Sequence, residues 1–326
     1  MYYFIVNTKS RSGKSLGVWK NVRKVLKEAH IEFKAYETQY EGHALKLARD
    51  ICKKKDEDKS LIIVGGDRTV NEVINGINDN GIEDFKKIKV GLIPAGSGND
   101  FARGLGIAGN ETDIIKEILE REKIAKDYKG ENYYTKIDIG QVTWKEDNLE
   151  KSRLFAISSG VGLDAIVCKK TNTSKLKKIL NKIRLGKLTY ILFTIETLFS
   201  MTTFMADVKI KDEKFKFNKV IFMANMNVRA EGGGVPMAPN ANPADGNLHM
   251  CMANGIPKWR TFFCLPLLVM ARHEGIKGFD IIDNEECEIM TDKPVVLHAD
   301  GEYLADTNEV KYMCLKEKLC ILNKIK

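Results

Sequence analysis

The chain has 326 residues, a length that suffices for two domains. Of these residues 44% are hydrophobic and 29% are charged, a composition that excludes a disordered or collagen-like chain. Its 52 basic and 44 acidic residues give a net charge of +8, and the segment from Lys169 to Lys187 contains eight basic residues and no acidic one. This local excess indicates an anionic surface as a partner and argues against a nucleic-acid-binding protein.

The first 135 residues alternate short apolar runs with amphipathic stretches. We expect strands at residues 2–6, 32–37, 60–64 and 89–93, and helices at residues 18–29, 43–52 and 70–78. Strands and helices that alternate at this spacing predict a parallel sheet covered by helices. In such a sheet, ligands bind at the carboxyl ends of the strands.

After residue 133 the sequence changes to short segments rich in Val, Ile and Phe, separated by Gly, Pro and Asn. We expect strands at residues 135–143, 152–158, 207–210, 219–224, 248–253, 287–291 and 294–298. Many short strands indicate a β-sandwich, with the basic segment inserted as a helix. The predicted first domain comprises residues 1–135 and the returning segment 307–326, and the second comprises residues 136–306.

Export and membrane insertion are not indicated. The seven cysteines form no CxxC pair, and their odd number argues against a complete set of disulfides, which favours a reducing compartment. The apolar stretches at residues 190–205 and 261–270 are interrupted or too short to span a bilayer. We therefore expect a cytoplasmic protein that is at most bound to a membrane surface.

Two glycine-containing loops follow neighbouring strands of the first domain. Residues 65–72 read GGDRTVNE, and residues 94–103 read PAGSGNDFAR. Glycines at a strand end allow a polyphosphate to approach backbone N–H groups, and the carboxylates of Asp67 and Asp100 suit a magnesium ion. Either loop alone is explained equally well as a tight turn with a helix cap. Two such loops at adjacent strand ends favour a phosphate site.

A further pair of carboxylates, Asp300 and Glu302, flanks Gly301 after the predicted strand at residues 294–298. A carboxylate placed here could accept the proton of a hydroxyl that attacks a phosphate. An Asp-Gly pair is also a common hairpin turn.

Together these motifs resemble the diacylglycerol kinase catalytic domain family. Residues 65–73 are similar to its GGDGTxNEV signature and residues 94–103 to its PxGTxNDFAR loop. Further similar segments follow the family order, at residues 7–11, 38–44, 155–167, 231–247 and 300–302. The resemblance implies a three-layer α/β nucleotide-binding domain, as in NAD kinases and diacylglycerol kinases, followed by a β-sandwich domain. It also implies ATP-dependent phosphorylation of a lipid hydroxyl, most directly diacylglycerol to phosphatidate in phospholipid metabolism.

The resemblance also implies roles for individual residues. ATP would contact Asn7, Thr8, Lys9, Ser10, Arg11, Thr38, Gly65, Gly66, Asp67, Arg68, Thr69, Val70, Asn71, Glu72, Ser97 and Asn99. Asp67 and Asp100 would arrange Mg²⁺, and a second metal would lie near Asn242, Asp245 and Asn247. Glu302 would deprotonate the acceptor hydroxyl with Asp300 beside it, in a cleft between the two domains.

One position departs from the family motif, because Arg68 replaces the glycine that follows the aspartate of GGDGT. If this position needs a positive φ or space for a phosphate, the side chain is strained or blocks the site. Alternatively, its guanidinium binds the phosphates. We expect an active kinase with altered nucleotide affinity.

Two other functions stay open. The acceptor could instead be a sphingoid base, another lipid alcohol or a soluble nucleotide. A different class would be a nucleotide- and lipid-binding protein that has lost catalysis through Arg68. We expect docking on an anionic membrane through the segment from Lys169 to Lys187, and the sequence leaves a homodimer open.

Overall fold

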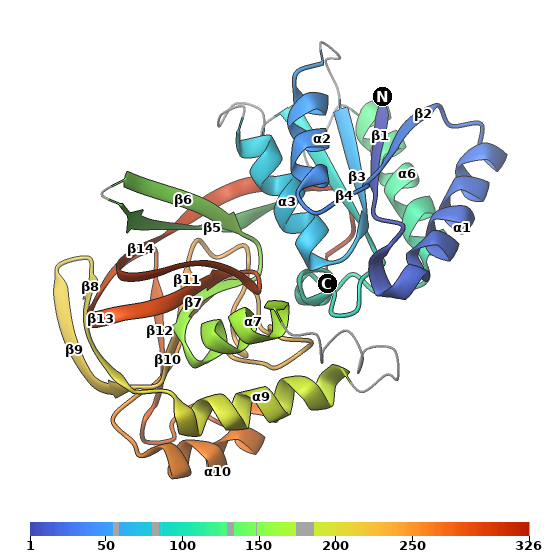
Figure 1. The fold of residues 1–326 in the computed structure, drawn as a ribbon. Coiled ribbons are helices and arrows are strands. Elements are labelled where there is room, and N and C mark those ends of the chain that lie inside the picture. Colours follow the sequence, from blue (N-terminus) through green and yellow to red (C-terminus); the bar gives the residue numbers. More distant parts are fainter. Residues whose placement is uncertain are drawn as a thin grey trace. The chain divides into compact units, whose positions relative to one another are not determined.

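A computed structural model describes residues 1–54, 59–79, 85, 87–128, 134–147, 149–173 and 186–325 (Figure 1). The chain divides into two compact units, of which the first holds residues 1–138 and 316–326 and the second holds residues 139–315. Two long strands, β5 (Thr135–Glu146) and β14 (Glu302–Ile321), each contribute residues to both units. Residues 307–315 were expected in the first domain but belong to the second unit, because this part of β14 runs antiparallel to β13 (Glu286–Ala299).

The first unit is a parallel sheet between two layers of helices. Its strands are β1 (Tyr2–Val6), β2 (Phe33–Glu37), β3 (Lys59–Gly65) and β4 (Ile88–Pro94), in the order β4-β3-β1-β2. Its long helices are α1 (Ser15–Glu28), α2 (His43–Cys52), α3 (Asp67–Asn78) and α6 (Glu111–Tyr128). Helices α1 and α6 cover one face, and α2 and α3 cover the other (Figure 1).

The side chains of β1 point alternately to the two faces of the sheet, and both sets are apolar and covered by helices. Phe4 and Val6 of β1 are buried with Trp19 of α1 and Ile115 of α6, whereas the intervening Ile5 is buried outside that cluster. Because successive side chains of a strand point to opposite faces, a strand that is apolar throughout requires helices on both sides. The expected three-layer α/β architecture is confirmed.

The last described residues complete this unit. Cys320 and Ile321 of β14 pair in parallel with Lys89 and Val90 of β4. The side-chain amide of Asn323 then donates to the Leu92 carbonyl at 2.9 Å and accepts from the Leu92 N–H at 2.7 Å. The carboxyl-terminal stretch therefore closes the edge of this sheet that β4 would otherwise expose.

The second unit is the expected β-sandwich. Besides β5, β13 and β14 it contains β6 (Leu149–Phe155), β7 (Ser158–Gly162), β8 (Phe204–Ile210), β9 (Glu213–Val220), β10 (Phe222–Met226), β11 (Leu248–Ala253) and β12 (Phe279–Asn284). The pairing runs β12-β11-β10-β7-β13, and β13 also pairs with β14 and β8. Strand β5 pairs with β6 and β14, and β8 pairs with β9.

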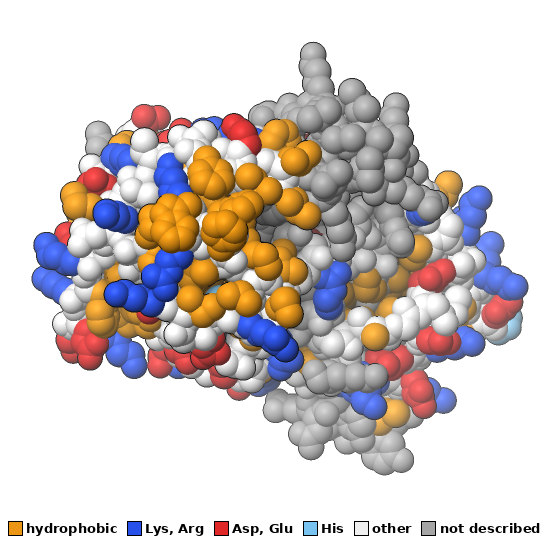
Figure 2. Space-filling view, turned by 90° about the horizontal axis from the view of Figure 1, so that it is seen from below, with side chains coloured by type: hydrophobic (Ala, Val, Ile, Leu, Met, Phe, Trp, Pro, Cys, Tyr) orange, Lys and Arg blue, Asp and Glu red, His pale blue; other side chains and the backbone are white. Residues whose placement is uncertain are grey.

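Three helices cover one face of the sandwich, namely α7 (Leu163–Thr173), α9 (Gly186–Ser200) and α10 (Lys258–Val269). Along β10, Met223 is buried in the core shared with β13 and β14, whereas Phe222 and Ala224 are buried with the three helices. Because successive side chains of β10 point to opposite faces of the sheet, one set contributes to the sandwich core and the other to a core beneath the helices. Apolar side chains also lie on the outer surface of α9 and α10 (Figure 2).

Several elements differ from those expected. The predicted strand at residues 219–224 is broken at Ile221, where β9 ends and β10 begins, and β9, β12 and β14 were not predicted. The apolar stretches at residues 190–205 and 261–270 form most of α9 and α10. Among the described residues, no helix is long and apolar enough to cross a membrane. Most of the predicted basic helix, residues 174–185, lies outside the described residues.

Candidate active site

A cavity of about 240 Å³ lies where β1 and β2 end and α3 begins. Its walls are Asn7, Lys9, Ser10, Thr38, Gln39, Tyr40, Glu41, Arg68, Thr69 and Glu72. Seven of these ten residues were predicted to contact ATP; Gln39, Tyr40 and Glu41 were not. Cationic, hydroxyl and amide groups around one opening at the carboxyl edge of a parallel sheet suit a phosphorylated ligand.

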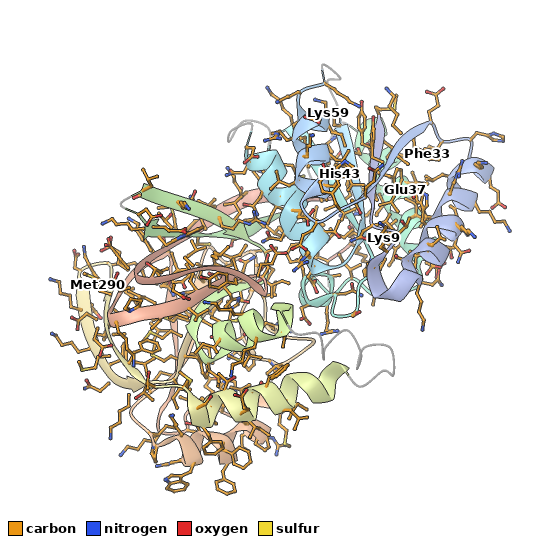
Figure 3. The ribbon with its side chains drawn as sticks, in the orientation of Figure 1. Lys9, Phe33, Glu37, His43, Lys59 and Met290 are labelled. Atoms are coloured by element: carbon orange, nitrogen blue, oxygen red, sulfur yellow. The ribbon has the colours of Figure 1, made fainter. Side chains whose placement is uncertain are left out.

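Hydrogen bonds fix the loops around this cavity. The Asn7 side-chain amide donates to the Thr69 hydroxyl at 3.1 Å, which joins the β1 loop to α3. Lys9 donates to the Gln39 carbonyl at 3.1 Å, and the Gln39 N–H donates to His43 Nδ1 at 3.1 Å. Lys9 and His43 thus hold the β2 loop from two sides (Figure 3).

Arg68 is part of the cavity wall. It lies in the first turn of α3 and has no positive φ, so the side chain causes no backbone strain at this position. Its guanidinium Nη1 lies 3.0 Å from the Glu41 carboxylate. The side chain lines the cavity, and binding of phosphates by its guanidinium stays a prediction.

Other predicted contacts support the cavity from behind. The two carboxylate oxygens of Glu72 accept the N–H groups of Gly42 and Ala44, each at 3.0 Å, and so cap the start of α2. Val70 and Asn71 are buried, and Asn71 accepts the side-chain amide of Asn75. Val70 and Asn71 do not line the larger cavity, whereas Glu72 both caps α2 and forms part of the cavity wall.

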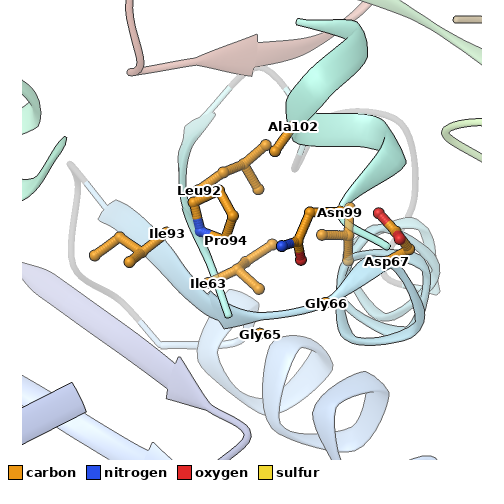
Figure 4. A pocket seen from close by; sticks show the side chains of 10 residues that line it. Ile63, Gly65, Gly66, Asp67, Leu92, Ile93, Pro94, Asn99 and Ala102 are labelled. Atoms are coloured by element: carbon orange, nitrogen blue, oxygen red, sulfur yellow. The ribbon is translucent and has the colours of Figure 1, made fainter. Parts of the chain in front are cut away.

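The glycine loops pack against each other. A Cβ on Gly96 would lie 2.4 Å from the Gly66 Cα, and a Cβ on Gly66 would lie 2.8 Å from the Gly96 Cα. Asn99, at φ 55°, accepts the Gly96 N–H and donates to the Gly96 carbonyl. Figure 4 shows Asn99 beside the loop of Gly65 and Gly66 at a small cavity of about 10 Å³. Contact between loops, which the sequence did not suggest, therefore accounts for Gly66 and Gly96.

Asp67 and Asp100 are brought together by these loops. The position of a Cβ on Gly98 lies 2.9 Å from Asp67 Oδ2 and 3.5 Å from Asp100 Oδ2, so both carboxylates face the same space. The other oxygens are engaged, because Asp67 Oδ1 accepts the Phe101 N–H at 3.2 Å and Asp100 Oδ1 lies 2.6 Å from Arg103 Nη1. Two carboxylate oxygens in one place are the ligand type that Mg²⁺ requires, so these residues fit the predicted ion.

Two further predicted contacts, Thr8 and Ser97, line neither cavity. Thr8 follows β1 but does not line the larger cavity, and Ser97 is exposed in the second glycine loop. Arg11 lies in the 3-10 helix Ser10–Gly13, and its side chain is outside the described part of the structure. Tyr40, which the sequence missed, stacks on His43 with 4.6 Å between ring centres and 12° between planes. The sequence position of Tyr40, two residues after the predicted contact Thr38, could have indicated that it lies at the same site.

In the second unit, Asp300 and Gly301 form the turn between β13 and β14. Both residues have positive φ, 47° and 78°, and they join the paired residues Ala299 and Glu302, as in a two-residue hairpin. The Asp300 carboxylate accepts the N–H groups of Ala156, Ile157 and Ser158 at 2.8–3.1 Å. Asp300 thus anchors the turn.

Glu302 follows this turn and pairs with an arginine of β6. Its Oε2 lies 3.6 Å from Arg153 Nη2, and both side chains are about one-fifth exposed. Its role as proton acceptor stays a prediction.

A buried network that the sequence did not indicate lies beside this turn. His298 Nε2 is 2.9 Å from Asp164 Oδ2, and Glu231 is close enough that one polar atom of each of the three residues lies within 4.8 Å of the others. Ser158 donates to Glu231, and the Gly301 N–H points at His298 Nδ1 at 3.3 Å. Burial opposes a charge on His298, but Asp164 outweighs it, with smaller contributions from Glu231 and Asp300, and the pKa of His298 is raised.

This raised pKa predicts a pH-dependent stability. A His whose folded pKa exceeds its unfolded value of about 6.5 stabilises the fold fully below that pH, and the stabilisation is lost as pH rises through the folded pKa. We therefore expect the free energy of unfolding to fall as pH rises above neutrality in the natural chain but not in a His298→Asn variant. Denaturant unfolding at a series of pH values measures this.

His30→Asn is the matched control, because His30 is exposed and has a positive φ that Asn adopts readily. Equal pH dependence in the natural chain and in His298→Asn would refute the assignment.

The second predicted metal site is a loop of the second unit. The Asn247 N–H donates to Asp245 Oδ1 at 2.9 Å, and the Ala244 N–H donates to Asn242 Oδ1 at 3.2 Å. Asp245 Oδ2 also lies 3.3 Å from His249 Nε2. The three predicted ligands share one loop, and a metal there stays a prediction.

Two lysines of the basic segment are paired in the structure. Lys169 lies 2.9 Å from Asp306 of β14, and Lys170 lies 2.8 Å from Glu196 of α9. Carboxylates from elsewhere in the chain therefore offset part of the local charge excess. Docking of a membrane on the rest of this segment stays a prediction.

Known proteins with similar sequences and folds agree with this organisation. Residues 1–129 match the family described as "Diacylglycerol kinase catalytic domain", and residues 157–322 match "YegS C-terminal NAD kinase beta sandwich-like domain". "Putative lipid kinase YtlR" of Bacillus subtilis (strain 168) is 30% identical over 310 residues, which is 94% of this chain and 94% of that protein. "Putative lipid kinase SAS0691" of Staphylococcus aureus (strain MSSA476) is 26% identical over 278 residues, or 83% of this chain and 80% of that protein.

The fold has solved counterparts. A crystal structure described as "a putative diacylglycerol kinase from Bacillus anthracis str. Sterne" superimposes with a TM-score of 0.72 at 19% identity, covering 99% of this chain and 94% of that one. At this identity the likeness shows the fold alone.

Proposed function

This chain belongs to the diacylglycerol kinase catalytic-domain family of lipid kinases, and from this membership we propose that it transfers the γ-phosphoryl group of ATP to the hydroxyl of diacylglycerol. The observation that supports the proposal most is the cavity at the ends of β1 and β2, where seven residues of the predicted ATP site come together. The product would be phosphatidate.

The cavity offers distinct surfaces to the parts of a nucleotide. Lys9 and Arg68 supply positive charge for phosphate oxygens, and Asn7 and Thr69 supply polar side chains between them. The exposed ring of Tyr40, supported by His43, offers a flat apolar surface on which a base can stack. Asp67 and Asp100 would hold Mg²⁺, which neutralises charge on the phosphates when bound.

Glu302 is the proton acceptor in this proposal. The acceptor hydroxyl gives its proton to the Glu302 carboxylate while its oxygen forms a bond to the γ-phosphorus, and the bond to the β-phosphate oxygen breaks to release ADP. Arg153 lies 3.6 Å from this carboxylate and holds its orientation, and Asp300 holds the turn that precedes Glu302. The nucleotide is thus assigned to the first unit and the proton acceptor to the second.

The test is an assay with labelled ATP and Mg²⁺ against diacylglycerol, ceramide, a sphingoid base and NAD. We expect label in phosphatidate, with diacylglycerol the preferred acceptor. Label in another lipid would assign a different acceptor to the same kinase chemistry. Transfer to none of these acceptors would refute the proposal and favour a nucleotide- and lipid-binding protein.

Arg68→Gly tests the departure from the family motif. If the guanidinium binds the phosphates, its loss raises KM for ATP by about tenfold, because a hydrogen bond between charged groups contributes about 1.5–3 kcal/mol. We also expect kcat to change less than KM. Initial rates at varied ATP measure both constants.

Glu41→Gln is the companion variant, because it removes the carboxylate that pairs with Arg68. We expect it to lower KM for ATP. A large rise of activity from near zero in Arg68→Gly would instead show that Arg68 blocks the natural site.

A further inference from the structure

Two neighbouring helices of the second unit leave large apolar side chains in solvent. They are Ile191, Leu192 and Phe199 of α9 and Trp259, Phe263 and Val269 of α10, with Met270 directly after it; we call this set the α9–α10 face. Each of these side chains is 50–68% exposed. Figure 2 shows hydrophobic side chains gathered here with Lys and Arg around them. A contiguous apolar patch on a soluble protein marks an interaction site more often than a single exposed side chain does.

The sequence of α10 is apolar on both sides. Thr261, Cys264 and Leu268 recur at helical spacing and are buried against the sandwich. Trp259 and Phe263, four residues apart, lie on the opposite side, where a helix on the surface of a soluble protein normally has polar residues. The outward apolar side is therefore not required by the packing of the helix.

The two helices form one continuous surface. The Phe199 and Phe262 rings lie 5.7 Å apart, and the Phe262 and Phe263 rings lie 5.4 Å apart. Lys258, at the start of α10, donates to the Phe199 carbonyl at 3.1 Å near the end of α9. The face is thus built on elements that are fixed to each other.

The charges of α10 and of the residues after it are positive as far as Arg272, and the next acidic residue, Glu274, accepts a hydrogen bond from Asn240. Residues 258–272 include Lys258, Arg260 and Arg272 and no acidic residue. No carboxylate of the described chain pairs with Arg260 or Arg272. The single acidic residue of α9, Glu196, is paired with Lys170.

We infer that the α9–α10 face docks on the surface of an anionic lipid bilayer, an inference that rests on the proposed function because its acceptor is a lipid. Trp and Phe side chains with flanking Lys and Arg are the combination that enters the interfacial region of a membrane. A second copy of this chain fits less well, because it would cover the apolar side chains without supplying the anionic groups that Arg260 and Arg272 attract.

The experiment is co-sedimentation of the full chain with vesicles of phosphatidylcholine, alone or mixed with phosphatidylglycerol. We expect binding to the mixed vesicles, and a fall of about tenfold in the partition coefficient for each of Trp259→Ser and Phe263→Ser, from the lost transfer of a large apolar side chain. Arg260→Glu with Arg272→Glu should abolish the preference for phosphatidylglycerol. Leu149→Ser, a change at an exposed residue of β6 outside the face, should bind as the natural chain does.

Equal partition of the natural chain and a Trp259→Ser/Phe263→Ser double variant, with equal unfolding midpoints, would overturn the inference. A natural dimer that becomes a monomer in this variant, with unchanged vesicle binding, would assign the face to a second copy and overturn it as well.

A kinase assay separates this inference from the proposed function. The double variant should phosphorylate short-chain diacylglycerol dispersed in water at the natural rate but lose activity toward diacylglycerol in vesicles. Face-dependent vesicle binding without any kinase activity would refute the proposed function and support docking. Equal activity of both proteins on vesicles would support the function and refute docking.

Discussion

Glu302→Gln lowers kcat for lipid phosphorylation by about 10²–10⁴-fold, the usual contribution of a positioned general base. The variant keeps the shape of the side chain but loses the carboxylate that accepts the hydroxyl proton. KM for ATP should stay near its natural value, because the proposed nucleotide contacts are all in the first unit. Initial rates with saturating diacylglycerol measure the loss.

Glu309→Gln is the control for this variant. Glu309 lies on the same strand, β14, and pairs with Lys145 at the surface, so we expect natural activity. The unfolding midpoints of the two variants should be similar. Retention of activity in Glu302→Gln would remove Glu302 from the mechanism while leaving the nucleotide site untouched.

Gly96→Ala should destabilise the chain by about 1–3 kcal/mol and reduce kinase activity, as expected for a group forced into a filled space. The added methyl would lie 2.4 Å from the Gly66 Cα, a backbone atom that cannot rotate away. Separation of the two loops would displace Asp67 and Asp100 from their shared space. Denaturant unfolding and the kinase assay measure the two effects.

Gly17→Ala is the matched control, since a Cβ on Gly17 in α1 has no heavy atom within 4 Å. We expect this variant to be at least as stable as the natural chain, because Ala favours a helix over Gly. If Gly96→Ala kept the natural free energy of unfolding and the natural activity, the prediction would be wrong, and the contact between the two loops would not be needed for either property.

Local sequence patterns predicted most of the first unit. Its strands are short apolar runs, and the GGDRT and PAGSGNDFAR loops follow strands that are neighbours in the sheet, so Asp67 and Asp100 meet as expected. The contact of Gly66 with Gly96 was not predictable, because a sequence shows that a residue lacks a side chain but not which backbone lies beside it. The sequence analysis therefore attributed these glycines to the binding of a phosphate and not to contact between the two loops.

Long-range pairing accounts for what was missed in the second unit. Strand β14 mixes charged and apolar residues over its twenty positions. Nothing in its sequence marks where it stops pairing with β13 of the second unit and begins to pair with β4 of the first. The network of His298, Asp164 and Glu231 combines residues from three distant segments. No local pattern identifies such a group, because each of its members alone is an ordinary polar residue.

The sequence also did not show which side chains of α10 are exposed. The apolar stretch that became α10 was too short to span a membrane, and nothing in its order of residues distinguished buried Cys264 from exposed Phe263. Only packing on the sandwich showed which side of the helix is turned outward.

The late return of the chain to the first unit has a consequence for biosynthesis. A ribosome delivers β1 to β4 long before it delivers Asn323, whose side chain bonds the Leu92 backbone beside the glycine loops. Until then β4 is an unprotected sheet edge, the kind of surface that attracts foreign strands. The first unit therefore reaches its final form only after the whole sandwich has been synthesised.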